Sequence, residues 1–386
     1  MKPARTLVFI GPERTDARSV KRIAALASHG WHVLGFTFHR ERGQADPPPE
    51  WENVHLGNTY SRRYFHRARA VVRGFWIILR HRRRIAHGAC LYTINVDNAL
   101  LGLFARFVCR RRIPLVVEIA DIQPVMNGTG LRSLVLRAME RFVLRRCQLL
   151  LTTSPAFVEN YFEPVQRYRE PVFLMENKVY PAAPLIAVRS PRAVPVRAGA
   201  PWVIGFFGVL RCERSMALIC RLAAALPEKV SFLLRGVPAG IDAEQFHRNI
   251  SAHPNIHYGG PYRYPDELPA LYGAIDLNWC FDFSASGANS AWLLPNRIYE
   301  GGLYHCPALA CAGTETGRWV ETNGCGKSFG EGLYENLYAF LDTLTTADWH
   351  NLRDKCAAAP DSLFAGEADY ASLHAALLQL ADSESK

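Results

Sequence analysis

The sequence predicts an α/β protein with two similar domains, each a parallel sheet covered by helices on both faces. The chain has 386 residues, which is too long for one ordinary hydrophobic core. Short, continuously apolar runs alternate with helical patterns, as they do where a parallel sheet is buried on both faces. This alternation occurs once before and once after a proline-rich stretch near the middle of the chain.

The first half begins with an apolar run at residues 6–10, the turn Gly11-Pro12 and a helical pattern over residues 16–28. We expect Gly30 to end that helix, because glycine tolerates the backbone conformation found just after helices. Further strands are expected at residues 31–38, 91–95, 114–119 and 148–153, with helices between them.

The second half repeats the pattern. Strands are expected at residues 202–207, 230–234, 256–258, 275–279 and 308–312, and helices at 213–226, 265–272, 295–303 and 370–380. The boundaries are then an N-terminal domain over residues 1–180, a linker over 181–200, a C-terminal domain over 201–368 and a C-terminal helix and tail over 369–386. In such folds the ligands bind in the cleft at the carboxyl ends of the strands.

Composition narrows the class of protein. Apolar residues make up 49% and charged residues 21%, which is typical of a globular protein and not of a disordered one. No apolar run reaches the about 20 residues of a spanning helix, and the N-terminal one is too short for a signal peptide. The ten cysteines show no C-x-x-C pair and no zinc spacing, so we expect reduced thiols, a cytoplasmic location and no metal.

Positive charge is concentrated in the first half, where residues 1–180 carry +15 and the remainder −5. Nine arginines fall between residues 62 and 84, interleaved with apolar residues at helical spacing. We expect this helix to lie on an anionic membrane surface, since arginines beside aromatic residues suit that place. The alternative is a stripe that packs on the sheet and leaves the arginines in solvent. The proposed surface residues are Arg62, Arg63, Arg67, Arg73, Phe75, Trp76 and Arg80.

Two segments of the second half have the pattern of a phosphate site. In the first, a strand ends at Gly208, and Arg211 and Arg214 lead into a helix whose N-terminal amides favour an anion. In the second, Pro295 suits the first position of a helix, and Glu300 lies one turn after Asn296. Each pattern also has an ordinary explanation, a common turn for the first and a solvated helix glutamate for the second. Two glycines after Glu300 disfavour the solvated glutamate, because they are costly in a helix unless packing or a ligand requires them.

A third segment carries two acids at the end of a buried strand. Glu118 and Asp121 lead into a loop that faces the expected cleft, where an acid could act as a general base on an acceptor hydroxyl. For Asp121, capping of a helix is the alternative.

The order of these segments resembles the family-4 glycosyltransferases, and most closely the bacterial exopolysaccharide members of the succinoglycan type. The resemblance covers nearly the whole chain, and its C-terminal motifs are the specific part. The matching segments are residues 15–22, 118–123, 152–157, 176–178, 205–215, 259–263, 289–302 and 312–319.

The resemblance implies the GT-B fold, in which two Rossmann-like domains face each other across a cleft. It also implies a hexosyltransferase that moves a sugar from a UDP-linked hexose to a lipid-linked glycan in exopolysaccharide biosynthesis, at the inner face of the cell membrane. Arg211 and Arg214 would contact the donor diphosphate in place of a metal ion, so no cofactor is expected, and Glu300 would bind the ribose. The further donor-binding residues that the resemblance implies are Gly208, Arg235, Tyr262, Ser290, Asn296 and Glu315.

One position departs from the family pattern. The family has two glutamates eight positions apart, and where the first would contact the transferred sugar this chain has Trp292. The donor sugar and the stereochemistry therefore stay open. An inverting reaction needs a general base, for which Asp121 is the first candidate and Glu118 and Asp282 are weaker ones.

Three other functions fit the sequence less well. A UDP-sugar 2-epimerase on the same fold would release a free sugar, and the basic, aromatic helix disfavours it. An arginine-rich nucleic-acid-binding protein is disfavoured because no recognition motif is present. An NAD dehydrogenase is disfavoured because no G-x-G-x-x-G sequence follows a strand.

Overall fold

The structure, a computed structural model, describes residues 5–40, 49–59, 64–187, 201–240, 242–284 and 288–383. The chain forms two compact units, one made of Met1–Met175 and Ala368–Lys386 and the other of Glu176–Glu367. The change of unit thus falls just before the expected linker, and the C-terminal helix α16 (Glu367–Ser383) packs with the first unit. Within the expected linker a short helix, α7 (Ala183–Ala187), is described, and residues 188–200 lie outside the described part.

The first unit contains a seven-stranded sheet in which every described pairing is parallel, in the order β3-β2-β1-β4-β5-β6-β7. Its central strands are fully buried, as continuous apolar runs predict. The strands are β1 (Thr6–Gly11), β2 (His32–Arg40), β3 (Glu52–Thr59), β4 (Cys90–Ile94), β5 (Leu115–Glu118), β6 (Leu149–Thr152) and β7 (Val172–Leu174).

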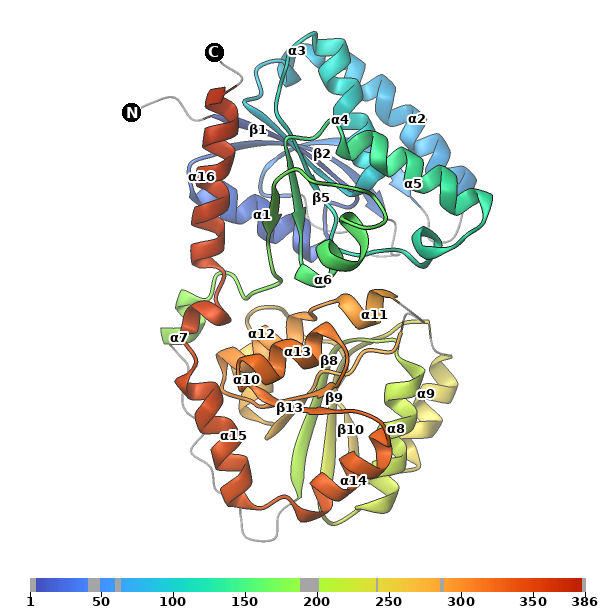
Figure 1. The fold of residues 1–386 in the computed structure, drawn as a ribbon, viewed down its shortest axis with the longest axis vertical. Coiled ribbons are helices and arrows are strands. Elements are labelled where there is room, and N and C mark those ends of the chain that lie inside the picture. Colours follow the sequence, from blue (N-terminus) through green and yellow to red (C-terminus); the bar gives the residue numbers. More distant parts are fainter. Residues whose placement is uncertain are drawn as a thin grey trace. The chain divides into compact units, whose positions relative to one another are not determined.

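Helices cover both faces of this sheet, with α2, α4 and α5 on one side and α1 and α16 on the other (Figure 1). Helix α1 begins where the Asp16 carboxylate accepts a hydrogen bond from the Ser19 amide at 2.9 Å, and it ends before Gly30, which has φ +89°. The helices are α1 (Ala17–Ser28), α2 (Tyr64–Arg80), α3 (Arg82–Ile85), α4 (Asn95–Cys109), α5 (Leu131–Leu144) and α6 (Pro155–Phe157), with single turns at Pro124–Asn127 and Val158–Phe162.

The second unit contains a six-stranded parallel sheet in the order β10-β9-β8-β11-β12-β13. Its strands are β8 (Trp202–Leu210), β9 (Val230–Pro238), β10 (Ile256–Tyr258), β11 (Leu277–Trp279), β12 (Ala308–Cys311) and β13 (Gly326–Phe329). Its helices are α8 (Glu213–Ala225), α9 (Ala243–Ser251), α10 (Leu268–Gly273), α11 (Ala288–Trp292), α12 (Asn296–Leu303), α13 (Glu315–Thr322), α14 (Leu333–Thr343) and α15 (Thr346–Ala358), with a turn at Asp361–Leu363.

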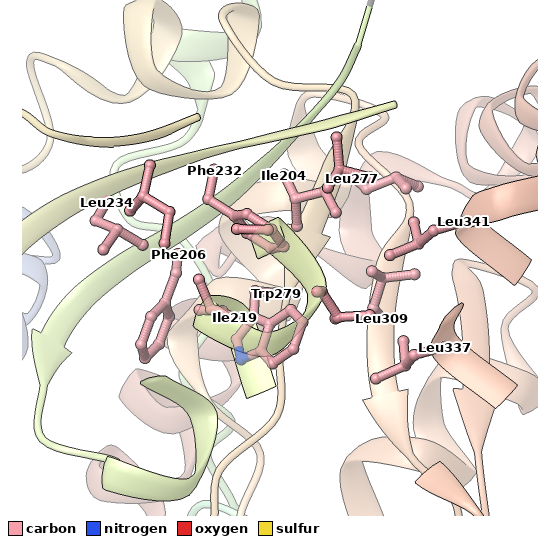
Figure 2. Packing of buried hydrophobic residues seen from close by; sticks show 14 of the residues in the cluster. Ile204, Phe206, Ile219, Phe232, Leu234, Leu277, Trp279, Leu309, Leu337 and Leu341 are labelled. Atoms are coloured by element: carbon pink, nitrogen blue, oxygen red, sulfur yellow. The ribbon is translucent and has the colours of Figure 1, made fainter. Parts of the chain in front are cut away.

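One hydrophobic core of this unit is formed between the sheet, including β8 and β9, and helices α8 and α14. Phe232 and Trp279 meet edge to face, with ring centroids 6.2 Å apart, and Ile204 and Leu277 pack beside them (Figure 2). This packing fixes the ends of the strands from which the site residues project.

Each expected strand is present, with ends shifted by up to four residues, and three strands were not expected: β3, β7 and β13. The prediction that Pro295 occupies the first position of a helix is wrong. It has the extended conformation of an N-cap residue, with φ −74° and ψ 148°, and α12 begins at the next residue.

Candidate functional site

The first part of the candidate site is the glycine pair at the carboxyl end of β8 and β9. Gly208 and Gly236 lie opposite each other in register, with φ +114° and +136°. A Cβ on Gly236 would lie only 1.7 Å from the Gly208 carbonyl oxygen, so the two backbones touch. The positive φ and the close approach both require glycine here.

Arg297 of α12 reaches across the ends of two strands. Its Nη1 donates to the carbonyl of Phe207 at 3.3 Å, and its Nη2 donates to that of Phe281 at 3.4 Å. Both hydrogen bonds are long, and its buried Nε has no partner among the described residues. The guanidinium also lies 4.0 Å from where a Cβ of Gly208 would be. It therefore has hydrogen-bonding capacity left for a ligand beside this glycine.

Arg211 lies on the loop that follows β8 and Arg214 in the first turn of α8, against the loop that follows β11. The Arg214 guanidinium carbon lies 4.3 Å from the centre of the Phe283 ring, and the Cys212 thiol accepts a hydrogen bond from the Phe283 amide at 3.3 Å. Both arginines are exposed. Among the described residues, no carboxylate lies within 4.0 Å of the guanidinium groups of Arg211, Arg214 or Arg297. No ion pair of 4.0 Å or less in the described part of the chain thus holds these three groups, although Asp282 lies close enough for the charges of Arg297 and Arg211 to act on it.

Asp282 interacts electrostatically with two members of this cluster, Arg297 and Arg211. Burial would raise the pKa of its carboxyl, but hydrogen bonds from Ser284 and the charges of Arg297 and Arg211 hold that pKa below its ordinary value. Its Oδ1 accepts from the Ser284 amide at 2.9 Å and from the Ser290 hydroxyl at 3.2 Å. Ser290 is therefore attached to this loop.

Glu300 lies on the buried side of α12, and only 4% of the residue is exposed. Its Oε2 accepts a hydrogen bond from the buried Tyr272 hydroxyl at 2.9 Å. Burial, and next the charge of Glu300, raise the pKa of Tyr262, which lies beside it. Glu300 is thus a positioned acid with a fixed orientation, and the solvated alternative is wrong.

The glycines that follow Glu300 are explained by packing. A Cβ on Gly301 would lie 2.3 Å from Nδ2 of Asn278, and one on Gly302 would lie 2.1 Å from the Phe364 ring. Asn278 uses that nitrogen to donate to the Arg297 carbonyl at 2.7 Å. Gly301 thus lets α12 approach β11 closely, and Gly302 lets it approach Phe364, which together fix the helix that carries Arg297 and Glu300.

Three of the expected donor-binding residues either contact other groups or have no side-chain hydrogen bond with the described residues. The Arg235 guanidinium donates to the carbonyls of Gly260 and Pro261 at 3.1 and 2.9 Å and to Glu267 at 2.9 Å, so it holds the turn that precedes Tyr262. Glu315 is paired with Arg318 at 2.7 Å. Asn296 is exposed at the start of α12.

In the first unit, Glu118 has a structural environment that does not suit a general base. Its side chain is 1% exposed, and the Arg22 guanidinium donates to both of its oxygens, at 3.1 and 3.0 Å. The Tyr92 hydroxyl donates to it as well. Burial would raise the pKa of Glu118, but the charge and hydrogen bonds of Arg22 lower it below the ordinary value. We therefore correct the proposal that Glu118 takes a proton from a substrate.

Asp121 remains available, because its side chain is 58% exposed at the loop after β5. Its Oδ2 lies 3.8 Å from Nη2 of Arg18. It does not cap a helix: the next turn, Pro124–Asn127, begins after Gln123 without a side-chain cap.

The arginine-rich segment expected to lie on a membrane forms α2 and α3, and the structure describes only part of it. Arg62 and Arg63 lie outside the described residues, as does the side chain of Arg67. Trp76 is exposed, as are Arg73 and Arg80, whereas Phe75 packs edge to face on Phe104 of α4 with ring centroids 5.0 Å apart. Phe75 therefore belongs to the helix–helix contact and not to the outer surface.

No helix of the described chain combines the length and the hydropathy that crossing a bilayer requires. Likewise, no group of three or more His, Cys, Asp or Glu residues in the described part is arranged to hold a metal ion.

Sequence reasoning missed Arg297 as a site residue. The clue was its place in the segment that also holds Asn296 and Glu300, three positions before the acid and so on a neighbouring face of the same helix.

Comparison with known proteins gives a family match in the first unit and a relative that is similar over most of the chain. Residues 18–178 match the model of the family described as glycosyl transferase 4-like domain. The chain is 31% identical over 342 residues to the succinoglycan biosynthesis protein ExoL of Rhizobium meliloti, covering 88% of this chain and 84% of ExoL.

Two solved structures share the fold of the whole chain. Sucrose-phosphate synthase of Thermosynechococcus elongatus is similar with a TM-score of 0.70 and 15% identity, over 98% of this chain and 100% of that one. Anabaena HepE in complex with UDP and glucose is similar with a TM-score of 0.68 and 16% identity, over 96% of this chain and 99% of that one.

Proposed function

The chain belongs to the family-4 glycosyltransferases of GT-B fold, and on that premise we propose that it transfers a hexose from a UDP-linked donor to a lipid-linked glycan in exopolysaccharide biosynthesis. ExoL is named for succinoglycan biosynthesis, and HepE was solved with UDP and glucose, which supports the choice of pathway class and of nucleotide.

The observation that carries the proposal is the cluster of Arg211, Arg214 and Arg297 at the carboxyl ends of β8 and β11. Three guanidinium groups that form no ion pair within 4.0 Å among the described residues, beside a glycine that leaves room for a ligand, suit a diphosphate. They would stabilise the charge that develops on the leaving UDP, the role that a divalent ion has in other enzymes. We propose that Glu300 accepts hydrogen bonds from the ribose hydroxyls.

The acceptor would be bound by the first unit. In an inverting reaction Asp121 would take the proton from the acceptor hydroxyl, because it is the exposed acid at the end of β5. Arginines of α2, among them Arg73 and Arg80, would hold the protein at an anionic membrane surface where a lipid-linked acceptor is reached.

A donor screen tests the proposal. Purified protein is given radiolabelled UDP-hexoses one at a time, together with membranes that contain lipid-linked glycan, and label in the extracted lipid is counted. We expect one donor to label the lipid, Arg297→Met to abolish most of that label, and Arg248→Met, which changes an exposed arginine of α9, to leave it unchanged.

Two results would contradict the proposal. One is the absence of lipid label from every UDP-hexose offered. The other is acceptor-independent release of a free sugar, which is the reaction of a 2-epimerase.

A further inference from the structure

Helix α5 has an apolar outer face that the proposed function does not use. The opposite side of the helix, which includes Ser133, Glu140 and Val143, is buried in the first unit. The outer residues recur at helical spacing, and each is between 38% and 77% exposed. They are Leu131, Leu134, Val135, Met139 and Phe142.

The neighbouring helices also carry exposed apolar residues. Helix α4 contacts both α2 and α5, and the three helices lie on the same side of the sheet (Figure 1). Phe107, near the end of α4, is 77% exposed. On α2, the exposed side chains Val72, Trp76 and Leu79 form a second stripe. We call these nine residues, including the five of α5, the outer apolar face.

Only positive charge accompanies this face on α5. The single acid of the helix is Glu140, which is buried, whereas Arg132 and, just after the helix, Arg145 and Arg146 are exposed. The Arg146 guanidinium carbon lies 3.8 Å from the centre of the Phe142 ring. On α2, Arg80 lies in the same way over Trp76, at 5.6 Å. Arginines that lie beside exposed aromatic rings are typical of helices at the boundary between lipid headgroups and acyl chains.

A large exposed apolar face normally marks an interaction site. A second copy of this chain, bound face to face, would bring arginines against arginines at a cost in free energy. An anionic bilayer supplies both negative headgroups for the arginines and an apolar layer for the leucines and Phe142.

We propose that α5 is the element that inserts into an anionic membrane, with the outer apolar face at the boundary between headgroups and acyl chains. The arginines of α2 then supply the longer-range attraction and α5 the apolar anchoring. This inference rests on the proposed function, in which the acceptor is lipid-linked, and it identifies the surface that docks.

Vesicle binding of the full chain tests it. Wild type and the variant Leu134→Asn/Phe142→Asn are sedimented with phosphatidylcholine vesicles, with and without phosphatidylglycerol. The measurements are made at about 0.1 M and about 1 M salt, where the Debye length falls from about 10 Å to about 3 Å. The control is Leu174→Asn on β7, since Leu174 is 39% exposed and lies outside this face.

We expect wild type to bind the anionic vesicles and to retain part of that binding at high salt, because apolar insertion is not screened. The double variant should partition at least about tenfold less and lose the salt-resistant part, since it removes two apolar anchors. The control should bind as wild type does.

Equal binding of the double variant and wild type would overturn the proposal. So would a concentration-dependent dimer that the double variant abolishes while its vesicle binding stays unchanged. Transfer to a short-chain, water-soluble acceptor is measured in parallel. If wild type transfers nothing there, the proposed function fails, whereas the vesicle result stands separately.

Discussion

Replacing Glu118 with glutamine is expected to destabilise the first unit and not to remove a catalytic group. Glu118 and Arg22 are each 1% exposed, and the guanidinium donates to both carboxylate oxygens. The remaining Arg22 nitrogen, Nη1, donates to the Tyr370 hydroxyl of α16 at 2.6 Å. The pair therefore connects α1, β5 and the C-terminal helix within one buried network.

The magnitude follows from what the glutamine leaves behind. It keeps the shape of the side chain but leaves Arg22 buried without a counterion, which costs about 3–5 kcal/mol in comparable sites. For a unit of this size, each kcal/mol lowers Tm by about 2–4 °C, so a fall of about 6–20 °C is expected. Calorimetry of wild type and variant measures it.

A second variant separates the lost charge from lost packing. Arg22→Met combined with Glu118→Leu removes both charges together, and it should be more stable than Glu118→Gln alone, since no uncompensated charge remains. The pH dependence has a definite sign. Arg22 lowers the pKa of Glu118, so its ionised form contributes stability above the ordinary carboxyl pKa. The difference between wild type and Glu118→Gln should therefore shrink as pH falls below about 4.

The reasoning would be refuted if Glu118→Gln unfolded at the wild-type temperature while transfer activity was lost. That result would return Glu118 to the catalytic machinery.

Three further predictions concern other positions. Burial raises the pKa of Glu140 to about 7, against hydrogen bonds from Tyr161 and Gln166. The stabilising contribution of Glu140 is thus present at low pH and lost as pH rises through 7. Between about pH 5 and 8 the free energy of unfolding of wild type should therefore fall by up to about 3 kcal/mol relative to that of Glu140→Gln. The same pH dependence of the unfolding free energy in both proteins would contradict this. Gly236→Ala would place a Cβ 1.7 Å from the Gly208 carbonyl and should cost about 3 kcal/mol in urea unfolding, whereas Gly240→Ala, with no atom within 4 Å, should cost about 1 kcal/mol. Asp121→Asn should lower kcat by about 10²–10⁴-fold with the donor KM unchanged, and a kcat within about twofold of wild type would remove Asp121 as the base.

The fold could be predicted because the inner strands of both sheets are continuous apolar runs. The three unexpected strands, β3, β7 and β13, all lie at sheet edges. An edge strand has one neighbour and needs no continuous apolar run, and the sequence of β13, Gly326–Phe329, has only one large apolar residue.

The candidate site could be predicted where its residues are close in sequence. Arg211, Arg214 and Glu300 each follow a local strand-to-helix or helix-start pattern. The role of Arg297 depends on the Phe207 carbonyl, 90 positions away, and that of Glu118 on Arg22, 96 positions away. Periodicity does not reveal partners at such separations.

The outer apolar face could not be predicted from the sequence for a similar reason. Both α2 and α5 have apolar stripes in their sequences, and periodicity alone cannot say which stripe faces the sheet. Packing decides it: Phe75 turns toward α4, and Leu134 and Phe142 turn outward.

The central claim is that guanidinium groups at the ends of β8 and β11 bind the diphosphate of a UDP-linked donor. Titration calorimetry of UDP against wild type and Arg297→Met tests it most directly. We expect the substitution to weaken UDP binding by at least about tenfold, because it removes a charge-assisted hydrogen bond, while Arg248→Met binds as wild type does. Equal affinity of Arg297→Met and wild type for UDP would contradict the account.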